Sequence, residues 1–242
     1  MSSPAESYFD TAREMLNRAR DLNAATIKTV GALIGKSIAE GGVLHTFGSG
    51  HSEIIGREII GRAGGLMPVS GIFDPGAGFS ENIVGYGTRL AERYDNTNGL
   101  HAGEVIIVIS NSGKNASPIE VALHAKKKGL TVIGLTSVAM STTAKTVHPS
   151  GQNLHAVSDH VLDNLGVSGD AIVNVTETQM AGPTSTFIGA TLLNLLALEA
   201  MTWLRDNGHE LPVVRSQNLP GGMEANIELS KRYRTRLSKL IG

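Results

Sequence analysis

The chain has 242 residues, a formal net charge of −1 and no cysteine. The near-neutral charge excludes a basic field that would recruit nucleic acid, and the lack of cysteine excludes disulfides, thiolate nucleophiles and cysteine-ligated zinc. The first residues lack the basic flank and apolar core of a signal peptide, and the longest apolar segment is short for a bilayer, so we expect a cytoplasmic protein without a nucleic-acid or membrane partner.

The first half of the chain alternates helices with short apolar strands. Apolar residues spaced along one side predict a long helix from about Ala5 to Glu40. The pattern then predicts, in order, a strand at 43–47, a Gly-Ser loop at 48–52, a helix at 53–62, a strand at 66–72, a Gly-rich loop at 74–87 and a helical stretch at 89–94.

The second half continues this alternation. It predicts strands at 105–109 and 131–135, a weaker strand at 161–162, a helix at 184–205 after Pro183, and a charged final helix at 224–240. The central strands are apolar on both faces, as a parallel sheet covered by helices requires. The sequence therefore predicts an α/β, doubly wound parallel sheet, built as one domain over 1–242 with added helices at both ends.

Small polar residues follow the strand at 105–109. Ser110, Ser112 and Asn115 offer hydrogen-bond donors, Gly113 would let the backbone approach a ligand, and the start of a helix adds positive potential. These properties favour a bound phosphate. A loop that only satisfies its own backbone is the alternative interpretation.

The next four residues, Ser117–Glu120, fit a capping box. Ser117 would be the N-cap, Pro118 the first helical residue, and Glu120 the acidic residue three positions after the cap. This pattern predicts that the helix begins at Pro118.

Two nucleotide-binding motifs fail at these loops. The dinucleotide motif G-x-G-x-x-G has Glu53 where its third glycine should be. The P-loop motif would need glycine at Val108 and serine or threonine at Asn115. We therefore expect a sugar phosphate or another small phosphate as the ligand.

The two loops resemble those of sugar isomerase (SIS) domains, G-x-G-x-S at Gly48–Ser52 and [IV]-S-x-S-G-x-[STN] at Ile109–Asn115. Three segments also resemble stand-alone bacterial SIS proteins related to phosphoheptose isomerases and N-acetylglucosamine-6-phosphate dehydratases: Gly50–Ser52, Arg62–Gly65 and Arg215–Asn218. The resemblance implies a flavodoxin-like five-stranded sheet with its core at about 31–207, and a homodimer or homotetramer.

The resemblance also implies roles for individual residues. The phosphate would contact Ser110, Ser112 and Asn115, helped by Ser49 or Ser52. Glu58 matches the catalytic glutamate of the E-x-x-G-R pattern of phosphoheptose isomerases, although it follows the first loop about one helical turn too early. The histidine that those enzymes carry on a later helix has no counterpart between Thr184 and Arg205, which weighs against a heptose substrate.

Chemistry in this family begins with removal of a proton beside a carbonyl, a step that a carboxylate or an imidazole performs. Glu58 is the first candidate base, with an ion pair to Arg62 as its alternative role. Glu81, in the Gly-rich loop, is the second candidate, and a solvated surface carboxylate is its alternative. His51 would polarise the carbonyl or protonate a leaving hydroxyl, unless it is a turn residue bonded to backbone.

Two more residues complete the expected contacts. Ser185 begins the apolar helix, where it contacts substrate or helps to cap the helix, and Asn218 lies in the polar tail. The histidines lack metal-site spacing, which predicts no dedicated metal site and no cofactor.

We therefore expect an enzyme for an amino- or keto-sugar phosphate. The best single guess for the substrate is N-acetylglucosamine 6-phosphate. Dehydration by a lyase and aldose–ketose isomerisation share their first step, so the sequence leaves both reactions open. The alternative is a non-catalytic module that senses sugar phosphates and works through a protein partner.

Overall fold

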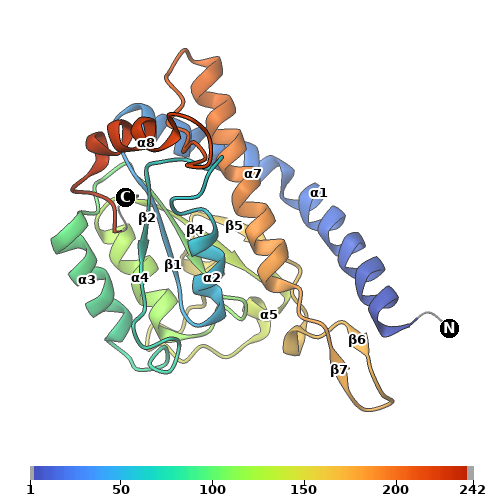
Figure 1. Cartoon of the computed structure of the whole chain (residues 1–242). Helices are drawn as coiled ribbons and strands as arrows, with labels where there is room; N and C mark the ends of the chain where they lie inside the picture. Colours follow the sequence, from blue (N-terminus) through green and yellow to red (C-terminus); the bar gives the residue numbers. More distant parts are fainter. Residues whose placement is uncertain (1–2, 239–242) are drawn as a thin grey trace.

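The computed structural model describes residues 3–238 and contains a five-stranded parallel sheet between two helical layers (Figure 1). Its strands are β1 (Leu44–Gly48), β2 (Val69–Ile72), β3 (Val105–Ile109), β4 (Thr131–Thr136) and β5 (His160–Asp163). The strand order is β2-β1-β3-β4-β5, and each neighbouring pair is parallel. This is the flavodoxin-like order, whose switch point lies between β1 and β3. The predicted fold class is confirmed.

Helices cover both faces of this sheet. They are α1 (Pro4–Ala39), α2 (His51–Glu58), α3 (Tyr86–Asn98), α4 (Ala116–Lys127), α5 (Val138–Thr143), α6 (Leu154–Val157), α7 (Ser185–Asp206) and α8 (Gly222–Ser230), with short 3-10 turns at Ser168–Asp170 and Lys231–Tyr233. The sequence did not predict the small antiparallel hairpin formed by β6 (Val173–Asn174) and β7 (Met180–Ala181). In Figure 1 this hairpin projects away from the sheet, below α7.

Strand β3 shows how the sequence builds the two layers. Val105, Ile107 and Ile109 point into a core shared with α1, α2 and α7. Ile106 and Val108 point into a second core, shared with α3, α4 and α6. All five side chains are buried, so the unbroken apolar run follows from burial on both faces.

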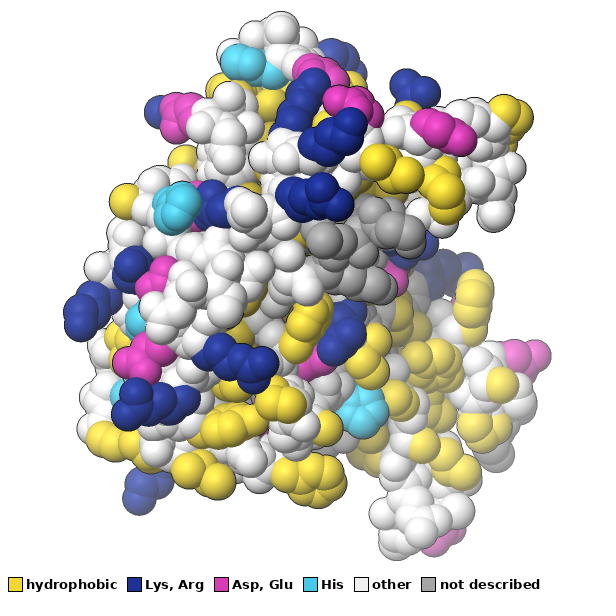
Figure 2. Space-filling view, turned by 60° about the vertical axis from the view of Figure 1, so that its left-hand side comes forward, with side chains coloured by type: hydrophobic (Ala, Val, Ile, Leu, Met, Phe, Trp, Pro, Cys, Tyr) yellow, Lys and Arg dark blue, Asp and Glu magenta, His cyan; other side chains and the backbone are white. Residues whose placement is uncertain are grey.

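The long helices α1 and α7 pack against each other and lie on the same face of the sheet. Within residues 3–238, α7 alone is long and apolar enough to cross a membrane by length and composition. Its buried residues, from Ile188 to Leu204, belong to the same hydrophobic core as α1 and the sheet. Positive and negative side chains are interspersed over the face shown in Figure 2, as the near-neutral net charge suggests.

The predicted capping box is wrong. Helix α4 begins at Ala116, with Asn115 as its N-cap, so Ser117 and Glu120 lie inside the helix. Glu120 accepts hydrogen bonds from the backbone N–H groups of Gly85 (2.5 Å) and Thr88 (3.0 Å). The Glu120 carboxylate therefore binds backbone N–H groups at the start of α3, and it does not cap α4 as the local pattern predicted.

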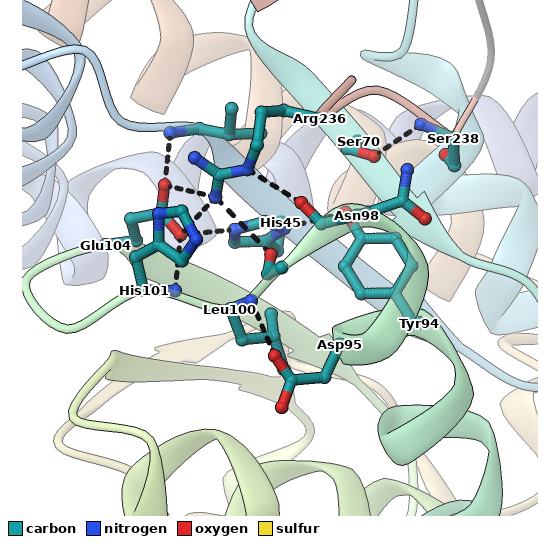
Figure 3. A network of polar contacts seen from close by, with 12 residues as sticks. His45, Ser70, Tyr94, Asp95, Asn98, Leu100, His101, Glu104, Arg236 and Ser238 are labelled. Carbon is teal, nitrogen blue, oxygen red and sulfur yellow. Dashed lines mark hydrogen bonds and ion pairs between the residues drawn. The ribbon is translucent and has the colours of Figure 1, made fainter.

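The final helix is shorter than predicted. Helix α8 ends at Ser230 and is followed by a 3-10 turn, and the predicted residues 239 and 240 lie outside the described residues. Beyond the turn, Ser238 attaches the chain to the edge strand β2, and Arg236 bonds the end of α3 and Glu104 (Figure 3). The Ser238 N–H donates to Ser70 Oγ (2.7 Å), and the Gly71 N–H donates to Ser238 Oγ (2.9 Å).

A buried polar network lies beside this attachment (Figure 3). The fully buried ring of His45 bonds Tyr94 through Nδ1 (2.8 Å) and Glu104 through Nε2 (3.0 Å). The Arg236 guanidinium donates to both oxygens of Glu104 (2.7 and 2.9 Å). Burial acts to raise the pKa of Glu104, but the hydrogen bonds and charges of these donors outweigh it and lower the pKa to about 2.

Candidate functional site

A cavity of about 880 Å³ lies where β1 and β3 end. This is the switch point at which doubly wound sheets bind ligands. We call it the first cavity. The residues predicted for the site that line it are Ser49, His51, Ser52, Glu81, Ser110, Ser112, Asn115 and Ser185.

Three helices begin at this cavity. His51 is the first residue of α2, Asn115 caps α4 and Ser185 is the first residue of α7, and all three residues line the cavity. Helix N-termini carry partial positive charge. No lysine or arginine is among the described residues that line the cavity, whereas Glu81 and Asp170 are. The backbone must therefore supply the positive potential for an anion here.

The residues after β3, which we call the phosphate loop (110–115), keep hydroxyl groups available to a ligand. Ser110 Oγ accepts a hydrogen bond from the Gly113 N–H (3.2 Å), so its own hydrogen remains free to donate. Ser112 is partly buried, and its hydroxyl makes no hydrogen bond within residues 3–238.

Gly113 packs on the inner side of the phosphate loop. It does not line the cavity, and its φ is +65°. A Cβ atom at this position would collide with the side chain of Ser141 and come within 3.0 Å of Thr136 Oγ1. Glycine is therefore required here by the close packing at the back of the phosphate loop, and its contact with a ligand stays a prediction.

Ser49 in the first loop is already engaged. Its hydroxyl donates to Asp74 Oδ2 (2.6 Å), so we do not count it among the donors to a phosphate. Asp74 also accepts from the N–H groups of Gly76 (2.8 Å) and Gly78 (3.0 Å) and from the Tyr86 hydroxyl (2.7 Å). Burial acts to raise the pKa of Asp74, but these four hydrogen bonds outweigh it, and the pKa is lowered.

Asp74 is a site residue that no motif in the sequence identified. Its signal is the segment Asp74-Pro75-Gly76, because an aspartate before Pro-Gly is typical of a turn in which the carboxylate accepts backbone N–H groups. Gly78 packs directly on the first loop, since a Cβ there would lie 3.1 Å from Gly50 Cα. Asp74 therefore ties the Gly-rich loop at 74–87 to the end of β1.

The same loop holds Glu81 at the cavity. Glu81 Oε1 accepts from Asn115 Nδ2 (2.6 Å), and the Glu81 carbonyl accepts from the Ser117 N–H (2.9 Å). No hydrogen bond within residues 3–238 reaches Glu81 Oε2. Asn115 Oδ1 is buried and also has no partner among the described residues. A carboxylate oxygen and an amide oxygen are thus left to accept from a ligand.

Glu58 lies apart from the first cavity. It is the last residue of α2 and does not line the cavity, whereas His51, Ser52 and Ile55 of the same helix do. It forms an ion pair with Arg62, and its side chain is 36% exposed. The structure therefore shows Glu58 in its alternative role, an ion pair with Arg62.

Ser185 and Asn218 differ in their placement. Ser185 lines the cavity, but its hydroxyl donates to Asp170 Oδ2 (2.5 Å), while Asp170 Oδ1 accepts from the N–H groups of Thr184 (3.0 Å) and Ser185 (3.2 Å). Asp170, which the sequence analysis missed, thus caps α7 from the preceding loop. Asn218 is exposed and does not line the cavity.

Within residues 3–238, no group of three or more His, Asp or Glu residues is placed to hold a metal ion.

Comparisons with known proteins agree with this fold. A family model described as "SIS domain" matches residues 7–137. The UPF0309 protein of Halalkalibacterium halodurans is 35% identical over 241 residues, which cover 97% of this chain and 96% of that protein.

Two solved structures share the fold. The phosphoheptose isomerase of Francisella tularensis superposes with a TM-score of 0.54 at 16% identity, covering 80% of this chain and 96% of that one. The Vibrio vulnificus NanR protein complexed with ManNAc-6P gives a TM-score of 0.50 at 15% identity, covering 97% of this chain and 70% of that one. At such identities the likeness concerns the fold alone.

Proposed function

The chain belongs to the SIS domain family, and on this premise we propose that it is an enzyme that binds a sugar phosphate in the first cavity and removes the proton beside the sugar's carbonyl. The observation that carries the proposal is the hydrogen bond between Glu81 and Asn115. It ties a candidate base to the loop that would hold the phosphate.

In this proposal the phosphate lies at the phosphate loop. The hydroxyls of Ser110 and Ser112 donate to its oxygens, and Ser52 contributes from the first loop. The N-termini of α2 and α4 add the positive potential that the cavity lacks in side chains. Neutral donors and helix ends together suit a small dianion.

Glu81 is the proposed base. Asn115 fixes one carboxylate oxygen, which leaves Oε2 to accept the proton from the carbon next to the carbonyl. Removing that proton places negative charge on the carbonyl oxygen, and His51 would stabilise this charge by donating a proton. Returning the proton to the neighbouring carbon completes an isomerisation. Loss of the 3-hydroxyl as water completes a dehydration instead.

We propose an N-acetylhexosamine 6-phosphate as the substrate. The proposal rests on the subgroup resemblance and on the absence of histidine between Thr184 and Arg205. The fold neighbour complexed with ManNAc-6P shows that a protein of this fold accommodates such a ligand. The free Oδ1 of Asn115 would accept from a sugar hydroxyl or from the N–H of an acetamido group.

Proton NMR in heavy water tests the proposal. A panel of hexosamine and heptulose phosphates is incubated with the protein, and exchange of the C2 proton and new product signals are followed. We expect exchange with the wild type and with Glu58→Gln, and none with Glu81→Gln, which should still bind substrate. Exchange by Glu81→Gln would refute the assignment of the base. Tight binding with neither exchange nor product would refute the enzyme and favour the sensing module.

A further inference from the structure

A second cavity of about 1,040 Å³ adjoins the first. It lies between α1, α5, the loop after β5 and the base of the β6–β7 hairpin. Ser112 and Met140 line both cavities. The two cavities therefore meet at the phosphate loop.

The charges of the two cavities differ. The second cavity is lined by Arg18 from α1 and Lys114 from the phosphate loop, and the first by no described cation. Both side chains are exposed, and no carboxylate within residues 3–238 lies at ion-pair distance from either. Two cations without an ion-pair partner among the described residues thus line the cavity that Ser112 joins to the first.

The carboxylate of Asp163 also lines the second cavity, and it accepts hydrogen bonds from backbone N–H groups. Asp163 Oδ1 accepts from the N–H groups of Val138 (3.1 Å) and Leu165 (2.9 Å). These bonds hold the Asp163 carboxylate against the backbone around β5, and the two cations still outnumber it. It makes no ion pair with Arg18 or Lys114, so the cavity keeps an excess of positive charge.

We propose that the second cavity binds a second anionic group, next to the phosphate held by the phosphate loop. Arg18 and Lys114 would make charge-assisted hydrogen bonds to it. A ligand that fills both cavities is then a sugar carrying two neighbouring anionic groups, of which a diphosphate ester is the simplest. The N-acetylhexosamine 6-phosphate proposed above has one phosphate and would occupy the first cavity alone. Apolar side chains such as Met15 and Ile172 would contact whatever the second group carries. This inference rests on the proposed function, which places the first phosphate at Ser110 and Ser112.

The test uses orthophosphate and pyrophosphate, which differ by one neighbouring phosphoryl group. Their affinities are measured by phosphorus NMR titration at low ionic strength. We expect the Arg18→Ala/Lys114→Ala double variant to weaken pyrophosphate binding by about tenfold and orthophosphate binding by no more than about twofold. Higher salt should reduce the pyrophosphate advantage of the wild type, since both cations are exposed.

A matched control removes the same charge elsewhere. Lys28 and Lys36 are exposed residues of α1 that do not line the second cavity. Lys28→Ala/Lys36→Ala should leave the ratio of the two affinities unchanged, and circular dichroism verifies that both double variants are folded. An equal loss in the two double variants, or a wild type that binds both probes alike, would overturn the inference while leaving the proposed function intact.

The phosphate loop itself separates the two proposals. Ser110→Ala/Ser112→Ala should weaken both probes and also the sugar phosphate. If it weakens none of them, the proposed phosphate site fails, and the inference about the neighbouring group fails with it.

Discussion

Glu104 gives a stability prediction whose size follows from the structure. Burial acts to raise its pKa, but hydrogen bonds and charges from His45 and Arg236 lower the value from 4.5 to about 2 on folding. A shift of this size corresponds to about 3 kcal/mol of stability at neutral pH. Glu104→Gln removes the charge but keeps the shape of the side chain, so it should lower the free energy of unfolding by about that amount.

The pH dependence gives the sharper measurement. Because the pKa of Glu104 is lower in the folded protein than in the unfolded chain, its contribution is complete above about pH 4.5 and is lost as the pH falls toward 2. The gap in stability between the wild type and Glu104→Gln should therefore narrow as the pH is lowered from 5 to 3. Burial lowers the pKa of His45, whereas Glu104 acts to raise it. Protonation of His45 at low pH should therefore destabilise Glu104→Gln more than the wild type and partly offset this narrowing.

Urea unfolding followed by circular dichroism measures this gap at each pH. Glu14→Gln, on the exposed side of α1, serves as the control and should match the wild type throughout. A gap of equal size at pH 7 and pH 3 would show that the loss comes from packing rather than charge, and the electrostatic reasoning would be refuted.

Three further predictions concern the first cavity. Ser112→Ala should weaken binding of N-acetylglucosamine 6-phosphate about tenfold by calorimetry, and unchanged affinity would place the phosphate elsewhere. Asn115→Ala releases Glu81 from its 2.6 Å hydrogen bond, so C2 exchange should slow about tenfold or more, with a smaller change in the dissociation constant; equal losses would argue for a binding role alone. Gly78→Ala brings a Cβ to 3.1 Å from Gly50 Cα at a φ of +91° and should cost about 1–3 kcal/mol in urea unfolding. Gly85→Ala, at a φ of +92° with open space around it, should cost less, and a larger loss there would contradict the packing argument.

The fold was predicted well because strands that are buried on both faces consist of apolar residues. The apolar run at 105–109 suits a strand covered on both faces, and the helices that flank it in the sequence cover those faces in the structure. The β6–β7 hairpin escaped prediction because each of its strands has only two residues. The start of α4 was wrong because a tertiary contact from Gly85 and Thr88 outweighed a local capping pattern.

The site was predicted less completely. Its residues contact partners that are far away in the sequence, and such contacts leave no local pattern. The two loops that follow β1 and β3 meet because parallel strands end at one edge. Motif matching alone favoured Glu58, but motif spacing does not show which end of α2 faces the cavity. The capping of α7 by Asp170 depends on a residue with a φ of +47° lying 15 positions before Ser185. No local pattern in the sequence shows such a contact.

The attachment of Ser238 to β2 bears on how the protein can be handled. Strand β2 is at the border of the sheet, and Ser238 bonds to Ser70 and Gly71 along it. An uncovered border strand is a template for pairing with another molecule and hence for aggregation. Truncations that remove Arg236 and Ser238 should therefore lower solubility before they alter the chemistry of the cavity. Affinity tags belong at the other end of the chain, beside the exposed start of α1.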